Sequence, residues 1–371
     1  MRIAIDAHSV GTQLAGNVTY ITNMIEQFAA IDRENEYTLY VTRPDAFEMY
    51  DGRWPNFSVR RIIAHNSRLM RFLFSFNTQL RLHPADIFFV QFNAPPFTPC
   101  KIVSSIHDLS FEHLPETFKW HSHTQMKITI RRTARNAAHI VTCSEYSRQD
   151  IIDTYKIAPE KVTTIPLAAA DWFRPVTDDE ELGRIRTKYH LPSDFILGVG
   201  SVQPRKNLVR LIEAYSILSD KRDLPPLILV GKKAWLFEDS LKAAREHGVD
   251  DKVRFTDFVP DQDLPGLYTL STCFVYPSFF EGFGIPPLEA MQCGSPVIAG
   301  NRTSLPEVVG DAGILVDPFD IPSIAGALDR VLSDSNLRED LRQKGFERAK
   351  LFSWHRAACE TLDIFKKVLN D

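Results

Sequence analysis

The sequence predicts an α/β protein made of two doubly wound domains, each a parallel sheet covered by helices. Short apolar segments alternate with helical patterns along the chain, which is typical of parallel strands joined by helical crossovers. The alternation fades once, between residues 168 and 192, where proline and acidic residues collect, and then begins again. With 371 residues, the chain is long enough for two complete hydrophobic cores.

The composition argues against several classes of protein. Hydrophobic residues make up 44% of the chain and charged residues 24%, as in ordinary globular proteins. The net charge of -4 argues against a general nucleic-acid binder. No apolar run reaches the ~18 residues that cross a bilayer, and the opening MRIAIDAHSV fits a strand rather than a signal peptide. The five cysteines form no C-x-x-C pair, so we expect free thiols and a cytoplasmic protein.

The first half of the chain opens with a strand, a loop and a helix. The strand spans residues 2–6, the loop 11–16 and the helix 17–30. The loop lacks the G-x-G-x-x-G spacing of a dinucleotide site, and Gly16 on its own would be a turn residue. Further strands are expected at 37–42, 59–64, 86–91, 102–106, 139–143 and 161–167, and further helices at 67–82, 119–136 and 145–155.

His107 directly follows the predicted strand 102–106. The carboxyl ends of parallel strands are where open α/β sheets bind ligands. A neutral imidazole at this place could form a hydrogen bond with a sugar hydroxyl. The residue alone equally fits a structural or helix-capping histidine.

Two segments of the first half, 67–82 and 119–136, are rich in arginine or lysine. The first fits an amphipathic packing helix, and the second fits a solvated helix face. The first also fits a surface for a lipid-linked or membrane-held acceptor, and the second also fits a surface that attracts anionic lipid or an acidic acceptor.

The second half repeats the alternation of strands and helices. Arg205 and Lys206 lie after its first strand, at a loop-to-helix junction. Two adjacent cations suit a diphosphate, although in isolation they could be ordinary surface charges. Strands are expected at 195–199, 227–231, 253–256, 274–276, 295–299 and 313–316, helices at 208–218, 321–332, 336–350 and 354–369, and a loop at 301–309.

The stretch 274–300 predicts a ligand site. A strand leads into the loop Glu281-Gly282-Phe283-Gly284, and two prolines follow at the start of a helix. Such a loop directs unpaired backbone N–H groups at an anion. The carboxylates of Glu281 and Glu289 lie on either side of this helix start, which indicates that hydroxyl groups of a sugar or a ribose are held there.

The D-x-D sequence at residues 261–263 precedes a helical pattern. We interpret it as helix N-terminal charge rather than as a metal site. No cluster of histidine, cysteine and carboxylate residues has metal-site spacing, so we expect neither a metal nor a cofactor.

The stretch PSFFEGFGIPPLEAMQCGSPVI, in which seven residues separate Glu281 from Glu289, resembles the signature of family 4 of the retaining glycosyltransferases. HDLSF at 107–111 and RKN at 205–207 resemble other parts of that family's pattern. The resemblance implies the GT-B fold, in which two Rossmann-like domains face a central cleft. It implies an acceptor-binding domain over 1–170, a linker over 171–189, a donor-binding domain over 190–352, and a helix over 355–371 that packs back on the first domain.

The resemblance also assigns roles to individual residues. It implies that His107, Glu281, Arg205 and Lys206 are catalytic. Many members carry an additional arginine after the glycine pair, where this chain has Ser201 and Val202. The residues that it assigns to donor binding are Gly16, Ser201, Phe258, Val259, Phe283, Gly284, Ile285 and Glu289.

These expectations describe a metal-independent transferase that moves a hexose from a nucleoside-diphosphate sugar to a glycan or lipid-linked acceptor. The pattern favours mannose from GDP-mannose and a place in bacterial polysaccharide or O-antigen assembly, and UDP-sugars stay open. We expect no nucleic-acid partner and a peripheral position on the inner face of the cell membrane. The alternatives are a GT-B nucleotide-sugar epimerase, which would need no acceptor, a retaining glycosidase with its two carboxyl groups ~5–5.5 Å apart, and a non-catalytic nucleotide-sugar binder.

Overall fold

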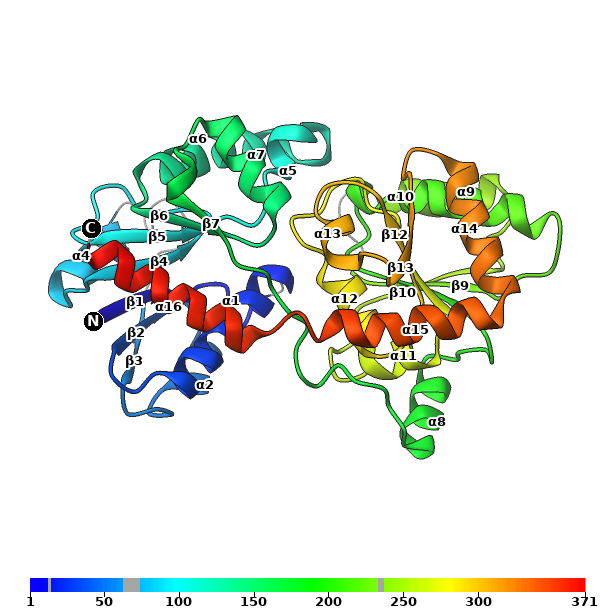
Figure 1. Ribbon diagram of the computed structural model, residues 1–371, viewed down its shortest axis with the longest axis horizontal. Helices are drawn as coiled ribbons and strands as arrows, with labels where there is room; N and C mark the ends of the chain where they lie inside the picture. Colours follow the sequence, from blue (N-terminus) through cyan, green and yellow to red (C-terminus); the bar gives the residue numbers. More distant parts are fainter. Residues whose placement is uncertain (13–14, 63–73, 233–236, 371) are drawn as a thin grey trace. The chain divides into compact units, whose positions relative to one another are not determined.

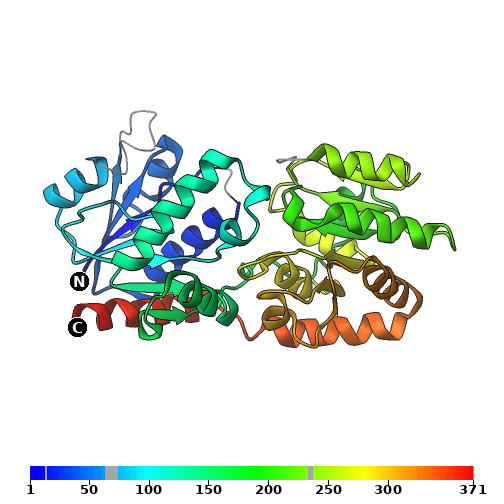
Figure 2. The same cartoon turned by 90° about the horizontal axis from the view of Figure 1, so that it is seen from above.

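The computed structural model describes residues 1–12, 15–62, 74–232 and 237–370, and divides the chain into two compact units (Figure 1). Unit 1 comprises Met1–His113, Phe118–Leu167 and Ser353–Asp371. Unit 2 comprises Leu114–Thr117 and Ala168–Phe352. Helices cover the faces of a parallel sheet in each unit (Figures 1 and 2), which confirms the predicted fold class.

Unit 1 contains a seven-stranded parallel sheet in the order β3-β2-β1-β4-β5-β6-β7. Its strands are β1 (Arg2–Asp6), β2 (Glu36–Val41), β3 (Phe57–Arg61), β4 (Ile87–Gln91), β5 (Lys101–Ser105), β6 (His139–Thr142) and β7 (Val162–Thr164). Its helices are α1 (Ala15–Ile31), α2 (Pro44–Tyr50), α4 (Phe76–Leu82), α5 (Ser110–His113), α6 (Trp120–Asn136), α7 (Glu145–Tyr155) and α16 (Trp354–Asn370).

The last helix, α16, completes the core of unit 1 by packing on α1. The ring of Phe365 lies 5.9 Å from that of Phe28 and 5.3 Å from that of Phe89. Trp354 at the start of α16 lies 6.1 Å from Tyr20 of α1. Burial of these aromatic rings supplies the apolar area that holds α16 on the sheet.

Unit 2 contains a six-stranded parallel sheet in the order β10-β9-β8-β11-β12-β13. Its strands are β8 (Ile196–Val199), β9 (Leu227–Val230), β10 (Val253–Thr256), β11 (Cys273–Tyr276), β12 (Val297–Gly300) and β13 (Gly313–Val316). Its helices are α8 (Asp179–Lys188), α9 (Leu208–Ser219), α10 (Phe237–Glu246), α11 (Leu264–Leu270), α12 (Ile285–Gln292), α13 (Leu305–Val309), α14 (Ile321–Ser333) and α15 (Ser335–Ala349).

The strand order of unit 2 fixes where its ligand site should lie. β8 pairs with β9 on one side and with β11 on the other, so the order of the chain reverses between β8 and β11. Open α/β sheets bind ligands at the carboxyl ends of the strands beside such a reversal. The loops after Val199 and Tyr276 therefore frame the expected site.

Some elements differ from the sequence-based expectations. The segment 301–309, expected as a loop, contains the short helix α13, because Pro306 lies in the first turn, where a missing N–H costs nothing. Gly16 lies in the first turn of α1 rather than in the preceding loop. Much of the segment 67–82 lies outside the described residues, and α4 accounts for its end. None of the described helices combines the length and apolar character that a membrane crossing requires.

The D-x-D segment has a structural role in unit 2. The buried Asp263 carboxylate accepts hydrogen bonds from Arg184 and Lys188 of α8, each at 2.6 Å, and from the Tyr189 hydroxyl at 2.5 Å. Burial alone would raise the pKa of Asp263, but these donors outweigh it and lower the pKa to about 2. The interaction joins α8, in the segment expected as a linker, to the start of α11.

Asp263→Asn should therefore destabilise unit 2. The change removes the charge that two cations and a hydroxyl share, so we expect a loss of roughly 1–3 kcal/mol in the free energy of unfolding. Urea denaturation measures it. Glu181→Gln removes a partly exposed carboxylate that also pairs with Arg184 and should change stability little. Equal stability of the two variants would contradict this role for Asp263.

Candidate active site

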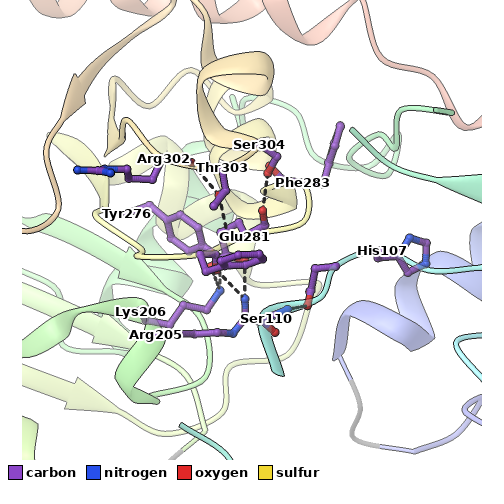
Figure 3. Close-up of polar contacts among 12 residues, drawn as sticks. His107, Ser110, Arg205, Lys206, Tyr276, Glu281, Phe283, Arg302, Thr303 and Ser304 are labelled. Atoms are coloured by element: carbon purple, nitrogen blue, oxygen red, sulfur yellow. Dashed lines mark hydrogen bonds and ion pairs between the residues drawn. The ribbon is translucent and has the colours of Figure 1, made fainter. Parts of the chain in front are cut away.

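Three charged side chains meet at the predicted place in unit 2. Arg205 and Lys206 lie on a 3₁₀ turn (Pro204–Lys206) after β8, and Glu281 lies in the loop after β11. Arg205 Nη1 donates to Glu281 Oε2 at 3.0 Å, and Lys206 Nζ donates to Glu281 Oε1 at 2.7 Å (Figure 3). The structure thus brings together three of the four residues expected to be catalytic.

The cluster of Arg205, Lys206 and Glu281 is largely shielded from solvent, so the charge of Glu281 depends on its two cationic neighbours. Lys206 and Glu281 are buried, and the Lys206 ammonium also lies 4.5 Å from the centre of the Tyr276 ring and donates to the Tyr276 hydroxyl. Burial would raise the pKa of Glu281, but the positive charges of Arg205 and Lys206 outweigh it and hold the pKa at about 2. Glu281 is therefore ionised at neutral pH. The sequence did not single out Tyr276, because an aromatic residue in an apolar strand is normally part of the core.

Two adjacent residues after β12 fix the backbone of the Glu281 loop. The Glu281 N–H donates to Thr303 Oγ1 at 3.0 Å. The Ser304 hydroxyl lies 2.8 Å from the carbonyl oxygen of Glu281 and 2.9 Å from that of Phe283. Because Ser304 is fully buried, these contacts hold the loop in one conformation. Sequence reasoning missed both residues, which it placed in an ordinary loop.

Asn207 holds the two sides of the site together. Its side-chain amide donates to the carbonyl oxygens of Pro277 at 3.1 Å and of Pro318 at 2.6 Å. Its backbone is left-handed, with φ of 60°, a conformation that asparagine adopts more easily than most residues. Asn207 therefore turns the chain from the Arg205-Lys206 turn into α9.

The start of α12 offers few backbone donors. Gly284 precedes it with φ of 112°, and an added Cβ would lie 2.7 Å from Leu305 Cδ2, so only glycine fits. Pro286 and Pro287 lack N–H groups. The free N–H groups of this helix start are thus concentrated at its very beginning, around Gly284 and Ile285, next to the buried Phe283.

The second carboxylate, Glu289, has different surroundings from Glu281. It is buried on α12, and its Oε2 accepts a hydrogen bond from the Tyr268 hydroxyl at 2.9 Å. Burial raises the pKa of Glu289 to about 7, although the hydrogen bond from Tyr268 opposes the shift. The two carboxylates therefore differ in charge near neutral pH.

Of the other residues expected in donor binding, Gly16 lies in α1 of unit 1, whereas Ser201, Phe258 and Val259 follow β8 and β10 of unit 2. Ser201 is exposed and follows Gly200, whose carbonyl oxygen would lie 1.9 Å from a Cβ on Gly231, so the loops after β8 and β9 touch through their backbones. After β10, Phe258 is exposed and Val259 is buried. These residues lie beyond the carboxyl ends of β8 and β10, the two strands that flank β9 in the unit 2 sheet.

The fourth residue expected to be catalytic, His107, belongs to unit 1 and follows β5. Its ring packs edge-on against Tyr20 at 4.3 Å and Phe92 at 5.6 Å. Both ring nitrogens are buried without a hydrogen-bond partner among the described residues. Burial lowers the pKa of His107 to about 4, so the ring is neutral. A capping role is not supported, since the Asp108 carboxylate accepts from the Ser110 N–H at 2.9 Å at the start of α5.

Unit 1 also contains a polar pair, Asp6 and His8, that the sequence analysis did not identify. Asp6 is the last residue of β1, next to the reversal of strand order between β1 and β4. Its buried carboxylate accepts the backbone N–H of His8 at 3.1 Å and lies 2.8 Å from His8 Nδ1. The pair could have been predicted because polar residues stand at the end of the first strand, where open α/β sheets bind ligands.

The described parts of the chain contain no group of three or more histidine, cysteine, aspartate or glutamate residues arranged to hold a metal ion. Asp263 of the D-x-D segment is engaged by the two cations of α8. Metal independence stays a prediction.

Comparisons with known proteins identify the family of the chain. Residues 184–348 match the family described as glycosyl transferases group 1, and residues 15–169 match glycosyltransferase family 4. The O-antigen chain mannosyltransferase B of Escherichia coli is 38% identical over 269 residues, which are 72% of this chain and 70% of that protein. The serotype-specific mannosyltransferase WbdA of Escherichia coli is 34% identical over 234 residues, which are 62% of this chain but 29% of that protein.

The fold has a close counterpart among solved structures. Sucrose-phosphate synthase from Thermosynechococcus elongatus superimposes with a TM-score of 0.80 over 100% of this chain and 99% of that chain, at 20% sequence identity. At this identity the similarity supports the fold alone.

Glu289→Gln should flatten the pH dependence of stability. Because the folded pKa of about 7 lies above the ordinary value of 4.5, the folded state binds more protons, and the free energy of unfolding falls as pH rises through this window. A shift of this size corresponds to as much as roughly 3 kcal/mol, which glutamine cannot lose by ionising. Urea denaturation across the window measures it, with the exposed Glu180→Gln as control. If the free energy of unfolding fell equally with rising pH in wild type and in Glu289→Gln, the raised pKa of Glu289 would be contradicted.

Proposed function

The chain belongs to the family 4 glycosyltransferases, and from this premise we propose that it is a retaining, metal-independent hexosyltransferase that uses a nucleoside-diphosphate sugar. The observation that supports the proposal is the paired cluster of Arg205, Lys206 and Glu281 at the strand-order reversal of unit 2. This cluster combines the charges needed for a diphosphate with a carboxylate suited to sugar hydroxyls.

Donor binding would exchange partners within this cluster. A diphosphate carries more negative charge than one carboxylate and accepts bidentate hydrogen bonds from a guanidinium. We infer that it replaces Glu281 as the partner of Arg205 and Lys206. The Glu281 carboxylate then accepts hydrogen bonds from the sugar. The buried pairing of charges in the free protein thus keeps all three groups ionised and close together until the donor binds.

In the transfer step, the bond from the anomeric carbon to the diphosphate oxygen breaks, and a bond from that carbon to the acceptor oxygen forms on the same face. Negative charge develops on the leaving diphosphate, where Arg205, Lys206 and the N–H groups around Gly284 would stabilise it. The acceptor hydroxyl loses its proton to the departing phosphate. We assign His107 to a hydrogen bond with the transferred sugar, which its neutral ring can make.

The relatives favour mannose as the transferred sugar, because two of them are named as mannosyltransferases. We propose GDP-mannose as donor, with UDP-sugars as the alternative, and a glycan or lipid-linked acceptor of O-antigen or other polysaccharide assembly. Glu289 would bind the ribose of the donor.

We also propose a peripheral contact between unit 1 and an anionic membrane surface. α6 exposes Trp120 (69%) and Ile128 (64%) beside the exposed Lys127. Phe97, 86% exposed, lies 5.9 Å from the guanidinium of Arg132. Exposed apolar side chains next to cations are the combination that binds lipid headgroups and the acyl boundary.

Glu281→Gln should separate donor binding from catalysis. Transfer should fall at least ~100-fold, because the sugar loses a charged hydrogen-bond acceptor, while affinity for the nucleoside diphosphate stays level or rises, because the cations lose their internal partner. Turnover with GDP-mannose and calorimetric titration with GDP measure the two effects. The exposed Glu339→Gln on α15 is the control. Transfer close to the wild-type rate would remove Glu281 from the site.

Lys206→Ala should weaken nucleotide binding about 10- to 100-fold, because a buried ammonium that faces the diphosphate is lost. A thermal-shift panel of GDP, UDP, ADP and TDP, with and without EDTA, identifies the base and tests metal independence together. Lys344→Ala removes an exposed cation from α15 and should leave every shift unchanged. Unaltered affinity in Lys206→Ala would mean that the phosphate loop is misassigned, and activity lost to EDTA and restored by manganese would refute metal independence.

Trp120→Ala combined with Ile128→Ala should reduce binding to vesicles that contain phosphatidylglycerol at least ~5-fold, because two large apolar side chains no longer enter the interface. Co-sedimentation measures the binding. Trp172→Ala, which removes an exposed tryptophan from unit 2, is the matched control. Equal sedimentation of wild type and both variants would refute this contact surface.

A further inference from the structure

Helices α11 and α12 pack against each other in unit 2, and a buried hydrogen bond connects them. The Tyr268 hydroxyl on α11 donates to Glu289 Oε2 on α12 at 2.9 Å, and both side chains are buried. Among the described residues, no other hydrogen bond reaches the Glu289 carboxylate. Its orientation therefore depends on Tyr268.

The ring of Tyr268 is itself fixed. It is fully buried and packs edge-on against Phe274 of β11 at 5.4 Å and against Phe173 at 6.1 Å. A ring enclosed in this way cannot change its rotamer without disturbing the core. The hydroxyl consequently has a defined position relative to α12.

The helix that carries Tyr268 is also held in place. Asp263 at its start is bound by Arg184 and Lys188 of α8. Gly266 within α11 lies against Ile185, where an added Cβ would be 3.0 Å from Cγ1. The packing of α8 on α11 thus places Tyr268, and Tyr268 places Glu289.

The hydrogen bond from Tyr268 makes the two carboxylate oxygens of Glu289 different from each other. Oε2 is taken by the Tyr268 hydroxyl, which leaves Oε1 to accept from a ligand. We propose that Tyr268 is a positioning residue that aims Glu289 Oε1 at a ribose hydroxyl of the donor, so that Tyr268 sets the preference for ribonucleotides over deoxyribonucleotides. The inference rests on the proposed role of Glu289 in donor binding. Tyr268 does not touch the ligand in this scheme.

The test compares Tyr268→Phe with wild type in calorimetric titrations with GDP, 2′-deoxy-GDP and 3′-deoxy-GDP, and with UDP and its deoxy forms in parallel. Wild type should bind the ribonucleotide more tightly than at least one deoxy form. In Tyr268→Phe, affinity for the ribonucleotide should fall about 5- to 10-fold, while affinity for the deoxy form changes less than ~2-fold. The ratio of the affinity for the ribonucleotide to the affinity for the deoxy form therefore approaches one. Phenylalanine keeps the ring, and a purely structural loss would weaken all nucleotides equally.

Tyr215→Phe provides the matched control. Tyr215, on α9, is also fully buried in unit 2, and its hydroxyl donates to the Pro225 carbonyl oxygen at 3.1 Å. This variant should keep the wild-type ratio. In a Glu289→Gln background, Tyr268→Phe should have no further effect on the ratio, since the two side chains act as one unit.

The outcomes separate the two proposals. Wild type that binds neither GDP nor UDP would refute the proposed function, and this inference with it. Wild type that discriminates against deoxynucleotides, together with Tyr268→Phe that discriminates equally well, would overturn the inference alone. An equal loss for all nucleotides in Tyr268→Phe would likewise overturn it.

Discussion

The pairing of Glu281 with Arg205 and Lys206 is the interaction on which the site of unit 2 depends. Three ionised groups that are mostly removed from water are tolerated only because each has an opposite charge within hydrogen-bonding distance. The strand-order reversal brings the loops after β8 and β11 together, and the buried Ser304 and Asn207 fix their backbones. The sheet therefore supplies the location, and charge neutralisation keeps the groups there.

The same unit contains a carboxylate with the opposite property. Glu281 is held ionised by two cations, whereas Glu289 accepts one hydrogen bond from a neutral hydroxyl, so burial dominates and raises the pKa to about 7. Two acidic residues close in sequence thus acquire different chemistry from their neighbours. This difference suits a site in which one carboxylate faces charged groups and the other faces a ribose.

The sequence predicted the strands well because each is a short apolar segment next to a turn. It also predicted that Arg205, Lys206 and Glu281 lie in one ligand site, because glycine, proline and charged residues recur there at informative spacing. It could not predict Tyr268 or Tyr276, because a tyrosine in an apolar segment normally belongs to the core. It missed the contacts of Asp263 with α8, because the partners are 75 and more residues away. The helix α13 was missed because four polar residues and a proline surround its start.

The order of the elements along the chain has a consequence for folding. The main segment of unit 2, Ala168–Phe352, lies in the chain between β7 and α16, both of which belong to unit 1. A ribosome therefore completes every residue of unit 2 before it makes Phe365, which covers Phe28 and Phe89. Domains generally fold as units during synthesis. Unit 2 can thus reach its native state first, while the apolar surface of unit 1 that α16 covers stays exposed until this helix has been made.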